Sequence, residues 1–289
     1  MKNNIKINVD KDYLLYEFLR MKLTSESKNN IKSLLSKKYV YVNDKLQTKY
    51  DYELHKDDVI SIKTTQIVDS DTNIKLNIIY EDKDIIVVDK PSGILTIANN
   101  KEKEFTIYHL VMNYLKSKRK NNRVFIIHRL DKDTSGVLIF AKSEKIKSLF
   151  QNNWNDRVLE RKYYAIVTGV LKNSKGTIRS YLKENQNYMV YSTNDKVNGK
   201  LAVTEYEAIK TNNNYTLLDI NIKTGRKNQI RVHLSDIGLS IIGDKKYGSN
   251  INPIKRLALH AYKIKLIDPR NNKVIEFSSK MPKEMSKIL

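Results

Sequence analysis

The sequence predicts an α+β protein whose larger part is a mixed, mostly antiparallel sheet. Segments with the pattern of strands outnumber helical segments along the chain. The helical segments fall at irregular intervals, unlike the regular alternation of βαβ units. A polar stretch without periodicity, residues 64–75, separates a short N-terminal part from the rest. We therefore expect two domains, residues 1–63 and 76–289, joined by a linker.

The N-terminal part combines helical and strand patterns. Apolar residues recur at helical spacing over residues 13–23 and 28–35. Residues 39–45, YVYVNDK, then alternate as a strand does, with Val40 and Val42 on one face, and end in an Asn-Asp turn signal. Another short strand is predicted within residues 55–63. Two helices followed by two or three short strands make a small α+β module of about 60 residues, close to the smallest size that folds alone.

The larger part begins with two strands around an acidic turn and continues with strands and scattered helices. Helical spacing marks residues 106–118, and residues 143–154 with Ser143 as the N-cap. A third helix is predicted over residues 226–237, where Ile230, Leu234 and Ile237 share one stripe and Arg231 flanks it. The predicted strands are residues 76–80, 84–90, 124–128, 136–143, 161–169, 201–210, 215–222, 257–267 and 274–277.

The charge of the chain is strongly positive. Its 53 Lys and Arg residues outnumber 32 Asp and Glu residues, which gives a net charge of +21. Such an excess favours binding to a polyanion, either nucleic acid or an anionic membrane, although a Lys- and Asn-rich composition can also follow from genome base composition. No apolar run reaches the ~20 residues that span a bilayer. We therefore favour nucleic acid and expect no membrane association.

Composition also bears on metals and on the compartment. The chain has no cysteine, which excludes disulfides, thiolate ligands and a cysteine nucleophile. Its five histidines lack the spacing of a metal site, so no metal is expected. The N-terminus lacks the apolar stretch of a secretory signal. These features favour a cytoplasmic protein.

Residues 128–136, HRLDKDTSG, place Asp131 between two predicted strands. A carboxylate held between strands is rigidly aimed, as a catalytic group must be. Arg129 would favour its ionised form, because an opposite charge nearby lowers the pKa of an acid. Gly136 allows a positive φ or a close approach. The same residues would also suit a solvated turn, so the motif alone leaves both interpretations open.

This motif resembles the signature loop of the RluA/RluD-type RNA pseudouridine synthases, His-Arg-Leu-Asp followed by Thr-Ser-Gly. Four further stretches match that family in the same order. They are VVDKPSGIL (87–95), RKYYAIVTG (161–169), TGRKNQIRVHLSDIGLSIIGDKKYG (224–248) and RLALHAYKIKLIDP (256–269). The resemblance covers about residues 76–280 and implies the pseudouridine synthase fold.

The resemblance implies an isomerase that breaks the N1–C1′ bond of a uridine in RNA and rejoins the base through C5. Asp131 matches the catalytic carboxylate, which either attacks the sugar or takes a proton from it. Tyr163 matches the tyrosine that stacks on the uracil, and Tyr164 should face the other way. Arg231 matches the arginine that forms an ion pair with the catalytic aspartate. No cofactor is implied, in agreement with the absence of a nucleotide-binding loop.

The matched motifs imply further contacts to the substrate. Arg129 resembles the arginine that occupies the vacated place of the flipped nucleotide or steadies that nucleotide. Because the reaction requires no imidazole, His128 and His233 are expected to form hydrogen bonds rather than to transfer protons. Other residues expected to contact substrate within the motifs are His128, Thr134, Lys90, Arg161, Arg226 and Gln229.

Two departures from the family pattern stand out. The histidine of Thr-Gly-Arg-x-His-Gln is Asn228 here, from which we expect altered local hydrogen bonding with activity retained. Residues 13–62 resemble, more loosely, the small S-four-like RNA-binding module, but KKYVYVND lacks both of its glycines. This module implies ribosomal RNA, particularly large-subunit RNA, as the substrate. We expect the protein to be a monomer. The alternatives are transfer RNA, or a non-catalytic RNA-binding or ribosome-assembly factor.

Overall fold

The computed structural model describes the chain except residues 1–4, 25, 37, 63–74, 99–105, 153, 170 and 172. The chain divides into two compact units, Met1–Lys75 and Leu76–Leu289, called here the N-terminal and C-terminal units. Almost all of the predicted linker, residues 64–75, lies outside the described residues.

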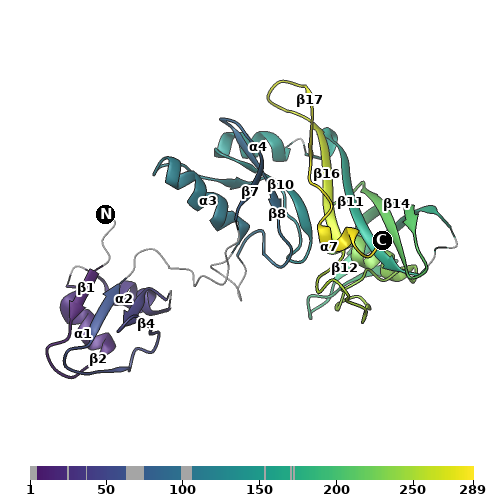
Figure 1. Cartoon of the computed structure of the whole chain (residues 1–289). Helices are drawn as coiled ribbons and strands as arrows, with labels where there is room; N and C mark the ends of the chain where they lie inside the picture. The colour runs from purple at the N-terminus through teal and green to yellow at the C-terminus, as the bar shows by residue number, and fades with distance from the viewer. Residues whose placement is uncertain are drawn as a thin grey trace. The chain divides into compact units, whose positions relative to one another are not determined.

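The N-terminal unit is a small sheet with two helices (Figure 1). Its four-stranded sheet has the order β1-β6-β3-β4, and β2 pairs with β5 separately. The first strand was missed, because its four residues become a recognisable strand only by pairing with β6. The elements are β1 (Ile5–Asn8), β2 (Tyr13–Leu14), α1 (Leu15–Lys22), α2 (Lys28–Ser36), β3 (Val40–Val42), β4 (Lys45–Leu46), β5 (Glu53–Leu54) and β6 (Val59–Ile62).

Apolar residues of both helices and of the sheet form the core of this unit. Phe18 of α1 and Ile31 of α2 are buried at the helical spacing that the sequence shows. Val40 and Val42 are buried on the same face of β3, as predicted, and they pair with β6. Two short helices and a few strands therefore share one continuous apolar cluster.

The C-terminal unit contains an 11-stranded sheet that is mixed and mostly antiparallel, as the sequence predicts. Among the strands that the structure describes, β10 and β16 form the one parallel pair. Two strands branch from the main path, where β9 pairs with β10 and β17 with β16. In spatial order the path is β13 (Val190–Thr193), β12 (Lys175–Glu184), β14 (Lys200–Thr211), β15 (Tyr215–Ile222), β11 (Val158–Thr168), β16 (Leu259–Ile267), β10 (Ser135–Ala141), β8 (Ile85–Lys90) and β7 (Asn77–Glu81); the branches are β9 (Phe125–Ile126) and β17 (Val274–Ser278).

Two strands of this sheet, β12 and β13, had no counterpart in the sequence prediction. Strand β12 is half-exposed along most of its length, so few of its side chains mark it as a core strand. It forms because it pairs with β14 on one side and with β13 on the other. Pairing with neighbours, rather than local hydrophobicity, therefore defines this edge of the sheet.

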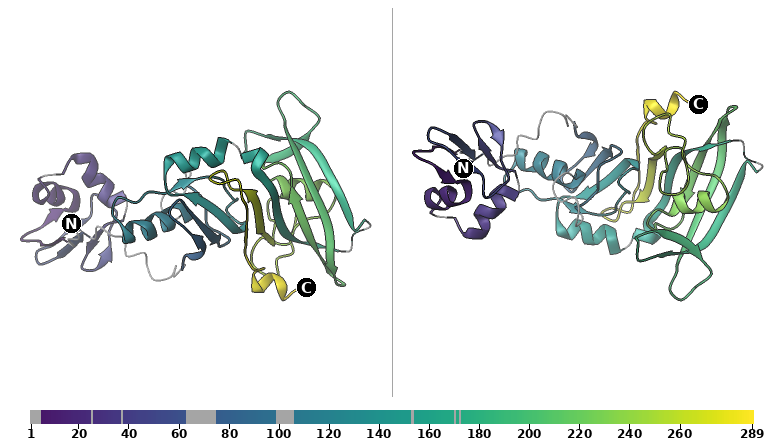
Figure 2. Two further views of the ribbon diagram at one scale, coloured as in Figure 1. Left: turned by 90° about the horizontal axis from the view of Figure 1, so that it is seen from above. Right: turned by 90° about the horizontal axis from the view of Figure 1, so that it is seen from below.

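Helices pack against the sheet (Figure 2), and the described residues of this unit include five of them. Thr106 caps the first one by accepting a hydrogen bond from the N–H of His109 (3.2 Å), and the Ser143 hydroxyl accepts one from the N–H of Ile146 (3.3 Å) before the second. Among the residues that the structure describes, no helix is both long and apolar enough to cross a membrane. The helices are α3 (Ile107–Lys118), α4 (Glu144–Asn152), α5 (Trp154–Arg157), α6 (Gln229–Asp236) and α7 (Lys283–Ser286).

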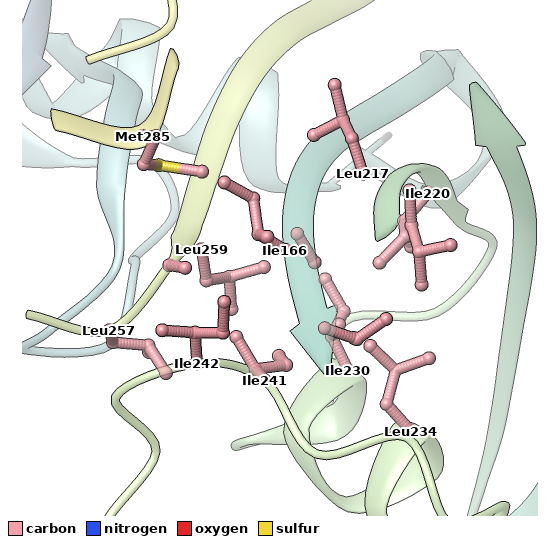
Figure 3. Packing of buried hydrophobic residues seen from close by; sticks show 14 of the residues in the cluster. Ile166, Leu217, Ile220, Ile230, Leu234, Ile241, Ile242, Leu257, Leu259 and Met285 are labelled. Atoms are coloured by element: carbon pink, nitrogen blue, oxygen red, sulfur yellow. The ribbon is translucent and has the colours of Figure 1, made fainter. Parts of the chain in front are cut away.

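Helix α6 fills the space beside β12, β13 and β14 (Figure 2). Its Ile230 and Leu234 enter the cluster that also holds Ile166 and Ile220 (Figure 3). The third residue of the predicted stripe, Ile237, lies just beyond the end of the helix and is 42% exposed, so that part of the prediction is wrong. Burial of this helix on several sides fixes its N-terminus against the sheet.

Candidate active site

The loop that carries Asp131 runs from β9 to β10 and is held on both sides of the aspartate. The carbonyl of Leu130 accepts a hydrogen bond from the Thr96 hydroxyl (2.8 Å). The carbonyl of Lys132 accepts one from the N–H of Gly93 (3.0 Å). Because both neighbours of Asp131 are fixed to the segment after β8, the direction of its side chain is set by the backbone.

Lys90, at the end of β8, strengthens this attachment and does not line the site. Its side chain is completely buried, and its ammonium group donates to the carbonyls of Ile94 (2.7 Å), Lys132 (2.9 Å) and Pro91 (3.0 Å). Burial lowers the pKa of Lys90 to about 7, although Asp133 and Asp131 nearby oppose that shift. The predicted substrate contact of Lys90 is therefore corrected to a structural bond beneath the loop.

The end of the same loop depends on glycine. Gly136 has a φ of +119° and pairs with Ala261 in the parallel ladder between β10 and β16. A Cβ at this position would lie 2.1 Å from the carbonyl oxygen of Ala261, so no other residue fits. Thr134, two residues earlier, is buried and closes the turn by donating its N–H to the carbonyl of Asp131 (3.2 Å). The close approach of the two strands explains the glycine at the end of the motif.

A cavity of ≈350 Å³ opens above the loop, within the size range of small-molecule sites. Its walls come from the Asp131 loop, from β11 and from the turn that begins α6. All predicted site residues except Lys90 line it, namely Asp131, Tyr163, Arg231, Arg129, His128, Thr134, Arg161, Arg226 and Gln229. Segments that are distant in the sequence thus converge on one space large enough for a nucleobase.

The N-terminus of α6 faces Asp131. Asn228, its N-cap residue, has a left-handed φ of 53°, which asparagine tolerates better than most residues. Its backbone N–H lowers the pKa of Asp131, as expected for a hydrogen-bond donor at the positive end of a helix. The Asn228 side chain donates to the Tyr247 hydroxyl (3.1 Å) and accepts from Nη1 of Arg231 (3.2 Å). Asn228 therefore connects Tyr247 and Arg231 to the helix end that faces Asp131.

Arg231 pairs with a different carboxylate from the one predicted. Its Nε and Nη2 atoms donate to the two oxygens of Asp244 at 2.8 and 2.7 Å. Arg231 acts on Asp131 through its charge alone, without an ion pair. It is also only 8% exposed, so the expectation that it flanks the buried face of its helix is wrong. A buried guanidinium requires such a bidentate partner, and the turn after α6 supplies it.

Tyr163 and Tyr164 point to opposite sides of β11, as strand geometry requires. Tyr163 lines the cavity, and burial raises the pKa of its phenol to about 12, so the ring stays neutral. Tyr164 stacks on Tyr262 with ring centroids 3.9 Å apart and planes 9° from parallel. The strand therefore presents one neutral aromatic ring to the cavity.

Opposing effects determine the charge state of Asp131. Burial raises its pKa above the ordinary value, while Arg231 and Arg129 oppose the shift, and the net direction is upward. The two arginines thus favour the ionised form of the carboxylate, while burial makes that carboxylate more basic than one on the surface.

We expect this raised pKa to appear in the pH dependence of the reaction. If Asp131 acts ionised, the single-turnover rate should fall as pH decreases through a pKa above the ~3.9 of a free aspartate. Arg129→Gln removes a cation that lowers this pKa, so its acid limb should lie at higher pH still. Rates measured between pH 4.5 and 8 test this, with substrate saturating throughout. An acid limb that is unchanged in Arg129→Gln would contradict it.

The two histidines predicted to form hydrogen bonds do so. Burial lowers the pKa of His128 to about 3, and its neutral Nε2 accepts the N–H of Ile139 (3.1 Å). Its ring stacks on Trp154, with centroids 5.0 Å apart. His233 bonds the hydroxyls of Thr204 (2.9 Å) and Ser180 (3.0 Å), and burial lowers its pKa. Neither imidazole is poised to exchange a proton near neutral pH.

Gln229 lines the cavity with an amide that is already engaged. Its Oε1 accepts from Thr224 (2.8 Å), and its Nε2 donates to the Val203 carbonyl (2.9 Å) and the Thr204 hydroxyl (3.0 Å). Arg161 also lines the cavity, and its Nη2 donates to the backbone carbonyl of Lys223 (2.8 Å). Gln229 therefore shapes the wall.

Asp244, Tyr247 and Trp154 are among the residues of the site that were not singled out from the sequence. Asp244 holds Arg231, Tyr247 bonds Asn228, and Trp154 lines the cavity beside His128. The first two lie in GDKKYG, the end of the matched stretch 224–248, whose sequence does not show which residues they contact. Trp154 carried only the weak signal of being the single tryptophan.

The cavity, its carboxylate and the convergent motifs agree with the comparisons to known proteins. The profile described as RNA pseudouridylate synthase matches residues 84–236, more than half of the chain. The chain belongs to this family. The synthase is thus an isomerase of uridine in RNA, and the fold and activity implied by its motifs are confirmed.

Curated relatives extend the match. The synthase is 36% identical over 219 residues to "Ribosomal large subunit pseudouridine synthase D" of Borreliella burgdorferi, covering 73% of this chain and 67% of the relative. It is 30% identical over 285 residues to the protein of the same name in Buchnera aphidicola, covering 91% and 89%. The solved structure of Human RNA Pseudouridylate Synthase Domain Containing 4 aligns with a TM-score of 0.60 at 23% identity, over 73% of this chain and 90% of that one, and so supports the fold.

Proposed function

We propose that the synthase isomerises one or more uridines of large-subunit ribosomal RNA, with Asp131 as its catalytic residue. The observation that carries this is the position of Asp131, a carboxylate of raised pKa in a cavity faced by Tyr163 and the start of α6. The names of the curated relatives support the choice of RNA. The synthase would act in the cytoplasm as a monomer.

In this proposal the target uridine leaves its stack and enters the cavity, at a cost of a few kcal/mol. Its uracil lies on the Tyr163 ring, while Arg129 steadies the flipped nucleotide. As a nucleophile, Asp131 bonds to C1′ while the N1–C1′ bond breaks, and this ester bond breaks in turn when C5 of the turned uracil attacks C1′. As a base, Asp131 takes the C2′ proton while the N1–C1′ bond breaks, and it returns that proton to C2′ when C5 bonds to C1′. The C5 proton is lost and N1 gains one, so no atom is added to the RNA overall.

Arg231 supports this chemistry from behind the aspartate. Held by Asp244, it cannot neutralise Asp131 by direct pairing, but its charge stabilises the ionised carboxylate in a partly dry site. The arrangement leaves the carboxylate, to which the N–H of Asn228 donates, without an ion pair to Arg231 and so able to act on the sugar. The N-terminal unit, of which residues 13–62 resemble an S-four-like module, is proposed to add RNA affinity through its charge.

Nucleotide-resolution mapping of pseudouridine tests the substrate. Cells that lack the synthase should lose the modification at one or more positions of large-subunit ribosomal RNA, and the intact gene should restore them. Loss confined to transfer RNA would replace ribosomal RNA as the substrate. If every RNA keeps all its pseudouridines, the protein is instead a non-catalytic RNA-binding or ribosome-assembly factor.

A further inference from the structure

The turn between β12 and β13 displays a tyrosine that the reaction described above does not use. Tyr188 is 72% exposed and has a left-handed φ of 59°, where a bulky side chain is strained. The turn is nevertheless well bonded, because Oδ1 of Asn185 accepts the N–H groups of Asn187 and Met189, each at 3.0 Å. An ordered turn thus holds an aromatic ring outward in a conformation that glycine or asparagine would adopt more readily.

One lysine lies over this ring, and a second one bonds the backbone of the same residue. The ammonium group of Lys227 lies 5.6 Å from the centroid of Tyr188 and also pairs with Glu184. That of Lys246 donates to the carbonyl of Tyr188 (2.9 Å). Lys227 at the same time lines the catalytic cavity. The exposed ring therefore contacts a residue of the cavity wall and has two lysine side chains near it.

The turn is also fixed relative to the catalytic helix. The N–H of Val190, two residues after Tyr188, donates to the Tyr247 hydroxyl (3.2 Å). The same hydroxyl accepts from Asn228, the N-cap of α6 whose N–H lowers the pKa of Asp131. One phenol thus connects the tyrosine turn to the helix end that faces the carboxylate.

We propose that Tyr188, with Lys227 and Lys246, forms a stacking platform for an RNA base that neighbours the target uridine. The inference rests on the proposed function, since it takes RNA as the substrate. Flipping one nucleotide leaves the adjacent bases without a stacking partner, and an exposed aromatic ring beside the cavity supplies one. The two ammonium groups meet the phosphates of the same nucleotides.

The platform is tested by binding two fluorescein-labelled probes to the full-length protein, a uridine decamer and an abasic decamer with the same phosphates. Tyr188→Asn removes the ring but suits the left-handed backbone, so the turn should be kept. It should weaken the uridine decamer about tenfold and leave the abasic decamer unchanged, as expected for loss of one stacked base. Tyr188→Phe should bind both probes as the parent does.

Two matched variants separate stacking from charge and from general exposure. Tyr191→Thr removes another exposed ring of the same hairpin, on the opposite face of β13 from the buried Val190, and should change neither affinity. Lys227→Gln should weaken both probes and reduce the salt dependence of binding.

Equal binding of the uridine decamer by Tyr188→Asn and the parent would overturn the platform, as would an equal loss in Tyr191→Thr. A loss of affinity for the abasic decamer in Tyr188→Asn would also contradict stacking. Since the assay includes no reaction, an outcome against the ribosomal substrate leaves this result intact. Failure of the platform and failure of the proposed function are therefore distinguishable.

Discussion

Asp131→Asn should lower the single-turnover rate of pseudouridine formation by about 10³-fold or more while RNA binding is retained. An amide can neither attack the sugar nor remove its proton, and such groups typically contribute 10²–10⁴-fold. The side chain is nearly isosteric, so the cavity should keep its shape. Mass spectrometry of a saturated RNA substrate, sampled over time, measures the rate.

The stability of this variant provides a check on the cause. Because burial raises the pKa of Asp131, its ionisation opposes folding near neutral pH. In the parent this destabilisation grows as pH rises through the folded-state pKa and disappears below the pKa of the unfolded chain. Asp131→Asn should therefore be no less stable than the parent at pH 7. A variant that has lost activity and also unfolds would leave the role of Asp131 as catalyst unsupported, and full activity would refute it.

Asp244→Ala should lower the free energy of unfolding by about 3–5 kcal/mol, the usual effect of removing one partner of a buried ion pair. The carboxylate is 1% exposed and both its oxygens accept from Arg231, which would remain buried without a counterion. The carboxylate also accepts the N–H groups of Lys246 and Tyr247, each at 3.1 Å, so the turn would lose its bonds as well. Urea denaturation monitored by circular dichroism measures the change.

Two further variants make this result specific. Glu144→Gln disrupts the exposed pair with Lys147 and should change stability by no more than about 0.5 kcal/mol. Arg231→Met combined with Asp244→Leu replaces both charges and should recover much of the lost stability, while activity stays low because Asp131 loses a supporting charge. A loss below 1 kcal/mol in Asp244→Ala, or full activity in the double variant, would contradict the proposed role of the pair.

Much of the C-terminal unit could be predicted from the local pattern of apolar and turn residues. The strands around Asp131 are apolar runs bounded by turn residues, and the helix after Arg226 shows the apolar period of α6. Tyr163 and Tyr164 face opposite ways because alternation is a property of any strand. Such features depend on residues that are neighbours in the sequence, and they could therefore be predicted from the sequence.

Other features could not be predicted in this way. Strands β12 and β13 lack a strong apolar pattern and form through their partners, so they were missed, together with the turn that carries Tyr188. The exposure of Ile237 follows from where α6 ends against its surroundings. The RNA-binding role of the N-terminal unit stays a prediction. Lys38 and Asp44 stand where the S-four-like pattern has its two glycines, and both have a positive φ.

The sequence by itself determined the family, the α+β class and the identity of the candidate carboxylate, because the motif residues and their order can be recognised without coordinates. Only the tertiary structure decided that Arg231 pairs with Asp244, that Lys90 lies under the loop instead of in the cavity, and that Tyr188 stands beside it. The physical reason is that a buried charged group needs an oppositely charged or hydrogen-bonding group within a few ångströms. Which group lies that close depends on how the sheet and the helices pack together.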